Sequence, residues 1–157
     1  MIVKDFNQLI VPCEQFDFNN PQIDPVELAQ SLVTEMLRHN GLGLAANQIG
    51  YNLRVFAIRG YPEHFVMFNP MIIDISNDQI VLEEGCLSFP GLIVKIKRPR
   101  TIRIRFYGPN GEMFIKEFID MTARVIQHEI DHLNGILFYN RANKYHRDQA
   151  FRRLKNE

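Results

Sequence analysis

Two histidines that lie four residues apart give the first sign of chemistry in this sequence. His128 and His132 belong to the segment QHEIDH (127–132). Residues at this spacing share one face of a helix, so the two imidazoles converge on one point and can chelate a transition metal. Glu129 lies beside the pair, where a carboxylate can reach a water at the metal without binding the metal itself. The segment therefore predicts a metal-assisted hydrolytic site on a helix.

A catalytic centre of this kind usually has three protein ligands and one open position, so a third ligand is needed. Cys86 is the strongest candidate. It lies in the segment EGCLS (84–88), where Gly85 permits close approach to the backbone and a thiol beside a divalent metal would be deprotonated. Cys13 is expected to fill space in the core. The other candidates are His39, His64, His146 and the carboxylates.

A third segment, GLGLAANQ (41–48), is rich in small residues. It lacks the G-K-[ST] ending of a phosphate loop and the spacing of a dinucleotide fingerprint. Its glycines would let a peptide backbone come close, and the side-chain amide of Gln48 could donate a hydrogen bond to a developing oxyanion. The segment is therefore a candidate for substrate binding, the alternative being a simple helix end and turn.

The chain that must position these groups has the size of one domain, and we expect a single catalytic domain over residues 1–157. It is 46% hydrophobic and 23% charged, with 18 basic and 18 acidic residues, which gives no electrostatic reason to expect direct DNA binding. The N-terminus does not resemble a signal peptide, and no apolar run is long enough to span a membrane. We therefore expect a cytoplasmic protein without a disulfide.

The expected elements begin with a helix that Asp24 caps, with Pro25 in its first turn, and that ends near Gly41. Asp120 is expected to cap a second helix, which runs to about residue 133 and carries the two histidines. Apolar and alternating segments between the helices predict strands at 53–58, 65–68, 71–75, 79–83, 98–107 and 112–119. Strands joined by hairpins between two helices indicate an α+β fold.

Taken together, GLGLAANQ, EGCLS and QHEIDH resemble the three motifs of peptide deformylases in order, spacing and key residues. The resemblance covers about residues 24–140. It implies antiparallel sheets packed around a central metal-binding helix. It also implies removal of the N-formyl group from the N-terminal formylmethionine of nascent polypeptides, with release of formate.

The resemblance also implies a role for individual residues. The metal, usually Fe²⁺ and replaceable by Zn²⁺, Ni²⁺ or Co²⁺, would be bound by Cys86, His128 and His132. A metal-bound water would attack the formyl carbon with Glu129 as general base and then general acid. The remaining roles are oxyanion stabilisation by Gln48 and the backbone N–H of Leu87, backbone contacts to the substrate from Gly43, Leu44 and Gly85, and a methionine pocket walled by Val125 and Arg124.

Three features depart from the usual family pattern. The N-terminal segment PCEQFDFNNPQ lacks the common opening motif, and Arg124 occupies a position that is more usually apolar. Arg124 is therefore expected either to narrow the pocket or contact the peptide, or else to face solvent. The chain also ends soon after the family core. These departures would suit an atypical or minimal member, such as one encoded by a virus.

The C-terminal segment 141–157 has six basic and two acidic residues. It predicts a solvated helix face, and the resemblance implies that it retains part of a ribosome-docking tail. The expected partners are thus formylmethionyl nascent peptides and the ribosome, with the protein itself a monomer.

Two other functions compete with this interpretation. A zinc endopeptidase could use His146 as its third ligand, but EGCLS and GLGLAANQ would then have no purpose. A non-catalytic domain stabilised by a metal would have no need of Glu129 or Gln48.

Overall fold

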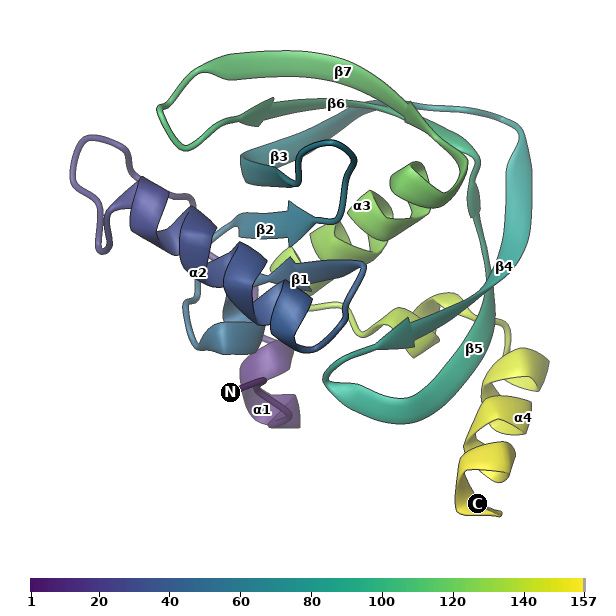
Figure 1. Ribbon diagram of the computed structural model, residues 1–157. Helices are drawn as coiled ribbons and strands as arrows, with labels where there is room; N and C mark the ends of the chain where they lie inside the picture. Colours follow the sequence, from purple (N-terminus) through teal and green to yellow (C-terminus); the bar gives the residue numbers. More distant parts are fainter. Residues whose placement is uncertain (157) are drawn as a thin grey trace.

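Helix α3 (Asp120–Leu133) lies inside the molecule with other elements on every side (Figure 1). The computed structural model describes residues 1–156. Along the chain its elements are α1 (Phe6–Leu9), α2 (Pro25–Arg38), β1 (Gly43–Ala45), η1 (Ala46–Ile49), β2 (Val55–Ile58), β3 (Phe65–Ile75), β4 (Gln79–Cys86), β5 (Phe89–Pro99), β6 (Thr101–Tyr107), β7 (Met113–Ile119), α3, η2 (Phe138–Arg141) and α4 (Lys144–Lys155).

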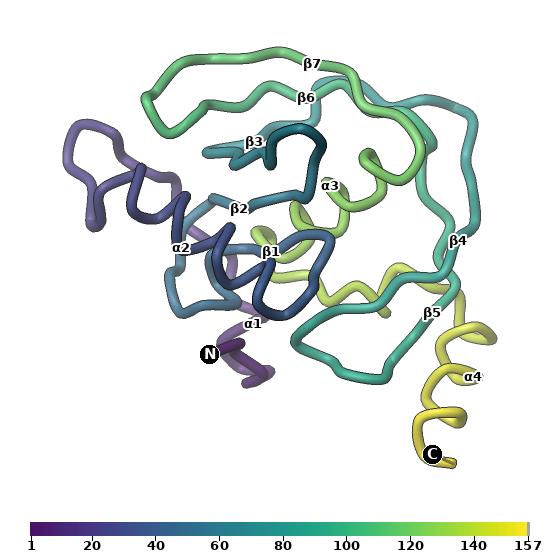
Figure 2. The backbone as a smooth tube through the Cα atoms, in the orientation of Figure 1, coloured from purple at the N-terminus to yellow at the C-terminus, as the bar shows by residue number. Residues whose placement is uncertain are grey.

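The strands form two antiparallel sheets. Strands β1, β2, β3, β6 and β7 form the larger sheet in that order, while β4 and β5 pair with each other as a long hairpin. The larger sheet curves over one side of α3, and the hairpin closes the other side (Figures 1 and 2). The expected α+β fold, with antiparallel sheets around a central helix, is confirmed.

Three apolar clusters hold this arrangement together. Strand β2 is buried on both faces because Val55 and Ala57 pack in the cluster under α2, whereas Phe56 and Ile58 pack in the cluster against α3. Residues on α3 at helical spacing fill the second cluster, and they are Ala123, Ile126, Ile130 and Leu133. A third cluster joins β5 to α4. Helix α3 is thus held by its apolar face, which leaves the opposite face free to carry polar side chains.

Several predicted elements are present in the structure, but some of them begin or end at other residues than expected. Helix α2 begins as expected, since the carboxylate of Asp24 accepts a hydrogen bond from the N–H of Glu27 at 3.1 Å. The two strands expected at 65–68 and 71–75 are one strand, β3, with a register shift at Asn69, whose φ is 49°. The strand expected at 98–107 is divided between β5 and β6. Most of β5, and the short β1, were not predicted.

The expected capping role of Asp120 is wrong. Ile119 is the N-cap of α3 and provides no side-chain hydrogen bond, while Asp120 is the first helical residue with φ at 57°. The Asp120 carboxylate instead accepts a hydrogen bond from Nε of Arg100 at 2.7 Å. This interaction ties the start of the helix to the β5–β6 connection.

Cys13 is 7% exposed and lies in the cluster against α3, as expected for a space-filling residue. Within residues 1–156, no helix combines the length and the apolar character that a membrane span requires.

Candidate metal centre and substrate cavity

Cys86, His128 and His132 converge at the end of strand β4 and on one face of α3. Their candidate ligand atoms all lie within 4.8 Å of one another, and Sγ of Cys86 lies 3.2 Å from Nε2 of His132. A thiolate with two imidazoles is a donor set that suits Zn²⁺ or Fe²⁺, and three protein ligands leave a position for water or substrate. The residues therefore fit a catalytic divalent metal ion.

The two histidines differ in protonation when no metal is bound. Although burial opposes the charge of His128, its hydrogen bonds to Cys86 and Glu84 raise its pKa to about 10, so metal binding would displace a proton from this imidazole. Burial is the main cause that lowers the pKa of His132 well below its usual value, and the nearby charge of His128 lowers this pKa further. The imidazole of His132 is therefore neutral. Nδ1 of His128 lies 2.9 Å from Oε1 of Glu84. A carboxylate oxygen can only accept, so Nδ1 is the protonated nitrogen and Nε2 is left for the metal.

Glu84 is the centre of a buried network of charges. Nε of Arg98 donates to its Oε2 at 2.6 Å, and Nη1 of Arg124 donates to the same oxygen at 2.5 Å. Arg98 also donates to Asp131 at 2.9 Å, and Asp131 accepts a further bond from Arg141 at 2.8 Å. The network connects the β4–β5 hairpin, α3 and the segment before α4.

Although burial opposes ionisation of Glu84, the hydrogen bonds from His128 and Arg98 and their charges outweigh it. The pKa of Glu84 falls to about 2. The carboxylate is therefore charged at neutral pH and acts as a fixed partner for His128.

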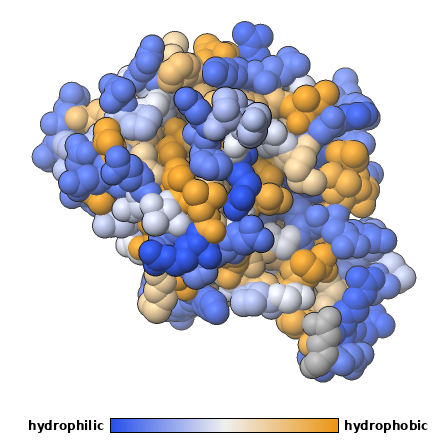
Figure 3. Space-filling view, viewed as in Figure 1, coloured by the Kyte–Doolittle hydropathy of each residue, from blue (hydrophilic) through white to orange (hydrophobic). Residues whose placement is uncertain are grey.

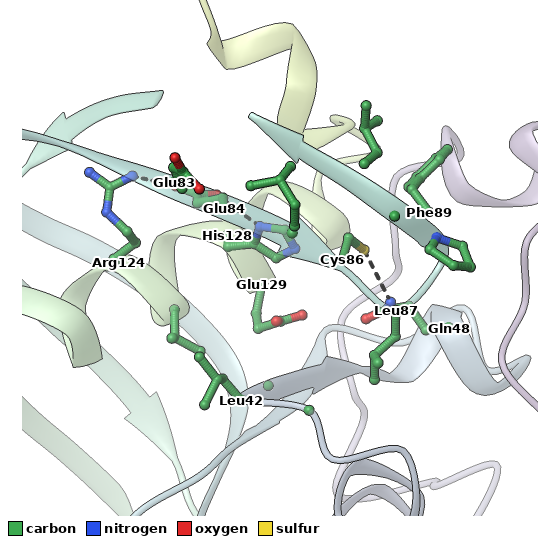
Figure 4. Close-up of a pocket in the computed structure, with 18 of the residues that line it drawn as sticks. Leu42, Gln48, Glu83, Glu84, Cys86, Leu87, Phe89, Arg124, His128 and Glu129 are labelled. Carbon is green, nitrogen blue, oxygen red and sulfur yellow. Dashed lines mark hydrogen bonds and ion pairs between the residues drawn. The ribbon is translucent and has the colours of Figure 1, made fainter. Parts of the chain in front are cut away.

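Glu129 is 3% exposed and its carboxylate points into the space beside the metal ligands (Figure 4). Among residues 1–156, its buried Oε1 has no hydrogen-bond partner. Burial raises its pKa to about 7, despite the opposing charge of His128. Gly43 faces this carboxylate, and a Cβ at that position would lie 2.6 Å from Oε2 of Glu129. A glycine is thus needed at residue 43 to leave the carboxylate room.

A cavity of about 450 Å³ opens over the metal centre. Apolar side chains gather near the middle of this face, and hydrophilic side chains surround them (Figure 3). The candidate residues that line the cavity are Gly43, Gln48, Gly85, Cys86, Leu87, Arg124, Val125, His128 and Glu129. Two candidates do not line it in the described part of the chain: His132, which is 1% exposed, and Leu44, which is fully buried in the cluster under α2.

Arg124 is 3% exposed, so the alternative that it faces solvent is wrong. Its guanidinium points to Glu84 (Figure 4) and also donates to the carbonyls of Ile96 and Ile80, at 3.0 and 2.6 Å. These bonds hold the positive charge of Arg124 against the β4–β5 hairpin. The part of the Arg124 side chain that lines the cavity is therefore mainly aliphatic.

Sequence reasoning missed Glu84, Arg98, Asp131 and Ser88 as parts of the site. The available signal was the position of three of them in the motifs. Glu84 and Ser88 are the first and last residues of EGCLS, and Asp131 lies directly before His132, a candidate metal ligand. No motif marks Arg98 in the sequence. Arg98 reaches Glu84 only because strand β5, which carries it, pairs with strand β4.

Replacing Cys86 with Ala is expected to remove metal from the purified protein, because two imidazoles alone hold a divalent ion weakly. The metal-to-protein ratio, measured by atomic emission after dialysis, should fall well below that of the unmodified chain. Cys13→Ala is the matched control and should keep its metal. Full metal content in Cys86→Ala would contradict Cys86 as a ligand.

The chain is similar to known proteins over most of its length. A family model described as polypeptide deformylase matches residues 3–148. The peptide deformylase of Treponema pallidum is 44% identical over 115 residues, which cover 72% of this chain and 70% of that protein. That of Synechocystis sp. is 39% identical over 120 residues, which cover 73% of this chain but only 64% of that protein.

The chain is also similar to solved structures. The crystal structure of peptide deformylase from Thermus thermophilus has a TM-score of 0.90 at 31% identity, covering 99% of this chain and 92% of that one. A Met-Ala-Ser-bound enzyme from Acinetobacter baumannii has a TM-score of 0.83 at 32% identity, covering 90% of this chain and 96% of that one. By the family model, the relatives and the shared fold, this chain belongs to the peptide deformylase family.

Proposed function

We propose that the protein is a metal-dependent hydrolase that removes the N-formyl group from formylmethionine at the start of nascent polypeptides and releases formate. The observation that carries this proposal is the meeting of three groups in and directly beneath one cavity. They are the ligand set of Cys86, His128 and His132, the buried carboxylate of Glu129, and the carboxamide of Gln48. A purely structural metal site would require only the first.

The proposed resident metal is Fe²⁺, for which Zn²⁺, Ni²⁺ or Co²⁺ can substitute. Bound by these three residues, it would polarise the formyl oxygen and lower the pKa of a water molecule. The family match supports a metal-dependent hydrolase, and the mixed sulfur and nitrogen ligand set is compatible with all four ions.

Glu129 is the proposed proton carrier. Its carboxylate is adjacent in sequence to His128, it faces the cavity, and burial brings its pKa to about 7. A group with this pKa can accept a proton from the attacking water and return it to the leaving amine near neutral pH.

The oxyanion that forms during attack needs hydrogen-bond donors already in place. We assign this role to the side-chain amide of Gln48 and the backbone N–H of Leu87, both of which line the cavity. Nε2 of Gln48 lies 3.6 Å from Sγ of Cys86, which puts the donor directly beside the metal centre (Figure 4).

The peptide is proposed to lie along the cavity as an added strand, between the backbone of β1 and the end of β4. Gly43, Leu44 and Gly85 would offer backbone groups there, so the burial of the Leu44 side chain is no obstacle. The methionine side chain would occupy the apolar part of the cavity, against Val125 and the aliphatic part of Arg124.

The wider setting is also a proposal. Residues 1–157 are taken as one catalytic domain that works as a cytoplasmic monomer. The basic segment 141–157 would contact the ribosome, supported by α4, whose last turn contains Arg152, Arg153 and Lys155.

An endopeptidase that uses His146 as third ligand receives no support. Among the described residues, the side chains close enough to share a metal are Cys86, His128 and His132, while His146 lies on α4.

A formate-release assay tests the proposed function. Metal-loaded protein, prepared without oxygen, is expected to release formate from formyl-Met-Ala-Ser and leave Met-Ala-Ser intact. Acetyl-Met-Ala-Ser is the control substrate and should react far more slowly. Cleavage of internal peptide bonds without formate would overturn the proposal.

A further inference from the structure

Ser88 is a buried residue to which the reaction described above gives no role. It lies in the turn between β4 and β5, two residues after Cys86, and is 3% exposed. Its Oγ lies 2.7 Å from the carbonyl oxygen of Val3 and 3.1 Å from Nε2 of Gln48. The hydroxyl thus connects the N-terminal segment to the carboxamide at the metal centre.

The chemistry of the partners fixes the direction of both hydrogen bonds. A carbonyl oxygen only accepts, so the single hydroxyl hydrogen of Ser88 is donated to Val3. The hydroxyl oxygen is then left to accept from the amide NH₂ of Gln48. At the other end of the carboxamide, Oε1 of Gln48 accepts from the N–H of Ala45 at 2.9 Å.

Only one orientation of the Gln48 amide satisfies these neighbours. A flipped amide would place its oxygen against Oγ of Ser88, whose hydrogen is already committed, and its NH₂ against the N–H of Ala45. Both contacts would be repulsive, and both groups are buried, where unpaired polar groups are costly. The observed orientation directs the NH₂ group to Ser88 and Cys86. Ser88 accepts one of its hydrogens, and the other points to Sγ of Cys86 at 3.6 Å, a weak contact beside the ligand atoms, where a reacting oxygen would replace the sulfur as acceptor.

The N-terminal segment is itself held firmly. The N–H of Val3 donates to the backbone carbonyl of Gln48 at 2.7 Å, so Val3 contacts Gln48 both directly and through Ser88. Ile2 is 8% exposed and packs in the cluster under α2. The segment can therefore act as a brace for the hydroxyl.

We propose that Ser88, braced by the carbonyl of Val3, is a positioning residue that holds the Gln48 amide with its N–H groups toward the reacting oxygen. The inference rests on the proposed role of Gln48 as an oxyanion donor. Its consequence is specific: loss of the Ser88 hydroxyl should weaken stabilisation of the transition state and leave the metal and the bound substrate undisturbed.

The test compares Ser88→Ala with Ser88→Thr in the metal-loaded enzyme, with formyl-Met-Ala-Ser as substrate. Ser88→Ala is expected to lower kcat about 10-fold, as for an interaction made mainly in the transition state, with KM and metal content unchanged. Ser88→Thr retains the hydroxyl and should recover most of kcat. Ser76→Ala is the matched control, since Ser76 also donates to a carbonyl and accepts from a backbone N–H, but at a half-buried position away from the cavity.

A double-mutant cycle shows whether the effect passes through Gln48. In a Gln48→Ala background, Ser88→Ala should have no further effect on kcat. An equal 10-fold loss in both backgrounds, unchanged kcat in Ser88→Ala, or metal loss that parallels the loss of activity would each overturn the proposal.

The kinetic results of the unmodified enzyme, Gln48→Ala and Ser88→Ala show which of the three ideas is wrong. If the unmodified enzyme releases no formate, the proposed function is wrong. If it does and Gln48→Ala keeps full kcat, the role of Gln48 is wrong, and Ser88 loses its role with it. If Gln48→Ala is impaired and Ser88→Ala is not, only the positioning role of Ser88 is wrong.

Discussion

Replacing Glu129 with Gln is expected to lower kcat for formyl-Met-Ala-Ser by about 10²–10⁴-fold, the usual contribution of a general acid–base group. The carboxamide has nearly the shape of the carboxylate, so it fits the space that Gly43 leaves and removes only the capacity to carry a proton. Metal content should stay unchanged, because the candidate ligands are Cys86, His128 and His132. Steady-state kinetics together with metal analysis check both parts.

The pH profile of the unmodified enzyme provides a second measurement of the same role. Glu129 must be ionised to accept a proton, and burial raises its pKa to about 7. A divalent cation at the adjacent ligands favours the ionised form, so the acidic limb of kcat/KM should have its midpoint below 7 in the metal-loaded enzyme. Activity therefore falls as the pH is lowered through that midpoint.

Glu117→Gln is the matched control, because Glu117 is an exposed carboxylate on β7 and should leave kcat unchanged. If Glu129→Gln kept full kcat, or lost metal and activity together, Glu129 would be no proton carrier.

The parts of this site that sequence could predict depend on local spacing. His128 and His132 are four residues apart on one helix, so their convergence follows from helix geometry alone. Asp24 caps α2 through a hydrogen bond to the N–H three residues later, which is an equally local pattern. Cys86 required the motif around it, since nothing in its spacing from α3 forces the contact.

The parts that could not be predicted depend on pairing between distant strands. The β5 residues Leu92, Val94 and Ile96 alternate with exposed residues, but Pro90 and Gly91 at the start of this segment resemble a turn and conceal the strand. Without β5 there was no way to place Arg98 beside Glu84, 14 residues earlier, or Arg124 beside it, 40 residues later. The network around Glu84 is therefore a product of the fold.

Replacing Glu84 with Gln should produce the largest loss of stability among single changes near the site. Glu84 is the buried counter-charge for Arg98 and Arg124, both of which are at most 5% exposed. Removing one partner of a buried ion pair leaves uncompensated charge in a poorly solvated place and typically destabilises a protein by about 3–5 kcal/mol. Urea unfolding of the metal-loaded protein at neutral pH measures this loss.

The control is Asp78→Asn. Asp78 forms an ion pair with Arg100 at 3.7 Å, but its side chain is 67% exposed, and solvent-exposed pairs contribute only about 0–1 kcal/mol. A loss of equal size in both variants would mean that burial of the network has no special importance. If only Glu84→Gln loses stability, the buried charges are the cause of the loss.

Glu84 also connects this stability to the metal. Its carboxylate accepts the Nδ1–H of His128, and loss of such a partner typically weakens metal binding by about 10–100-fold. Because the pKa of Glu84 is lowered from 4.5 to about 2, its contribution to stability is complete above about pH 4.5 and is lost as the pH falls toward 2. The difference in unfolding free energy between the unmodified chain and Glu84→Gln should therefore shrink over that range. A difference that stayed constant down to pH 2 would show that the charge of Glu84 is not what stabilises the fold.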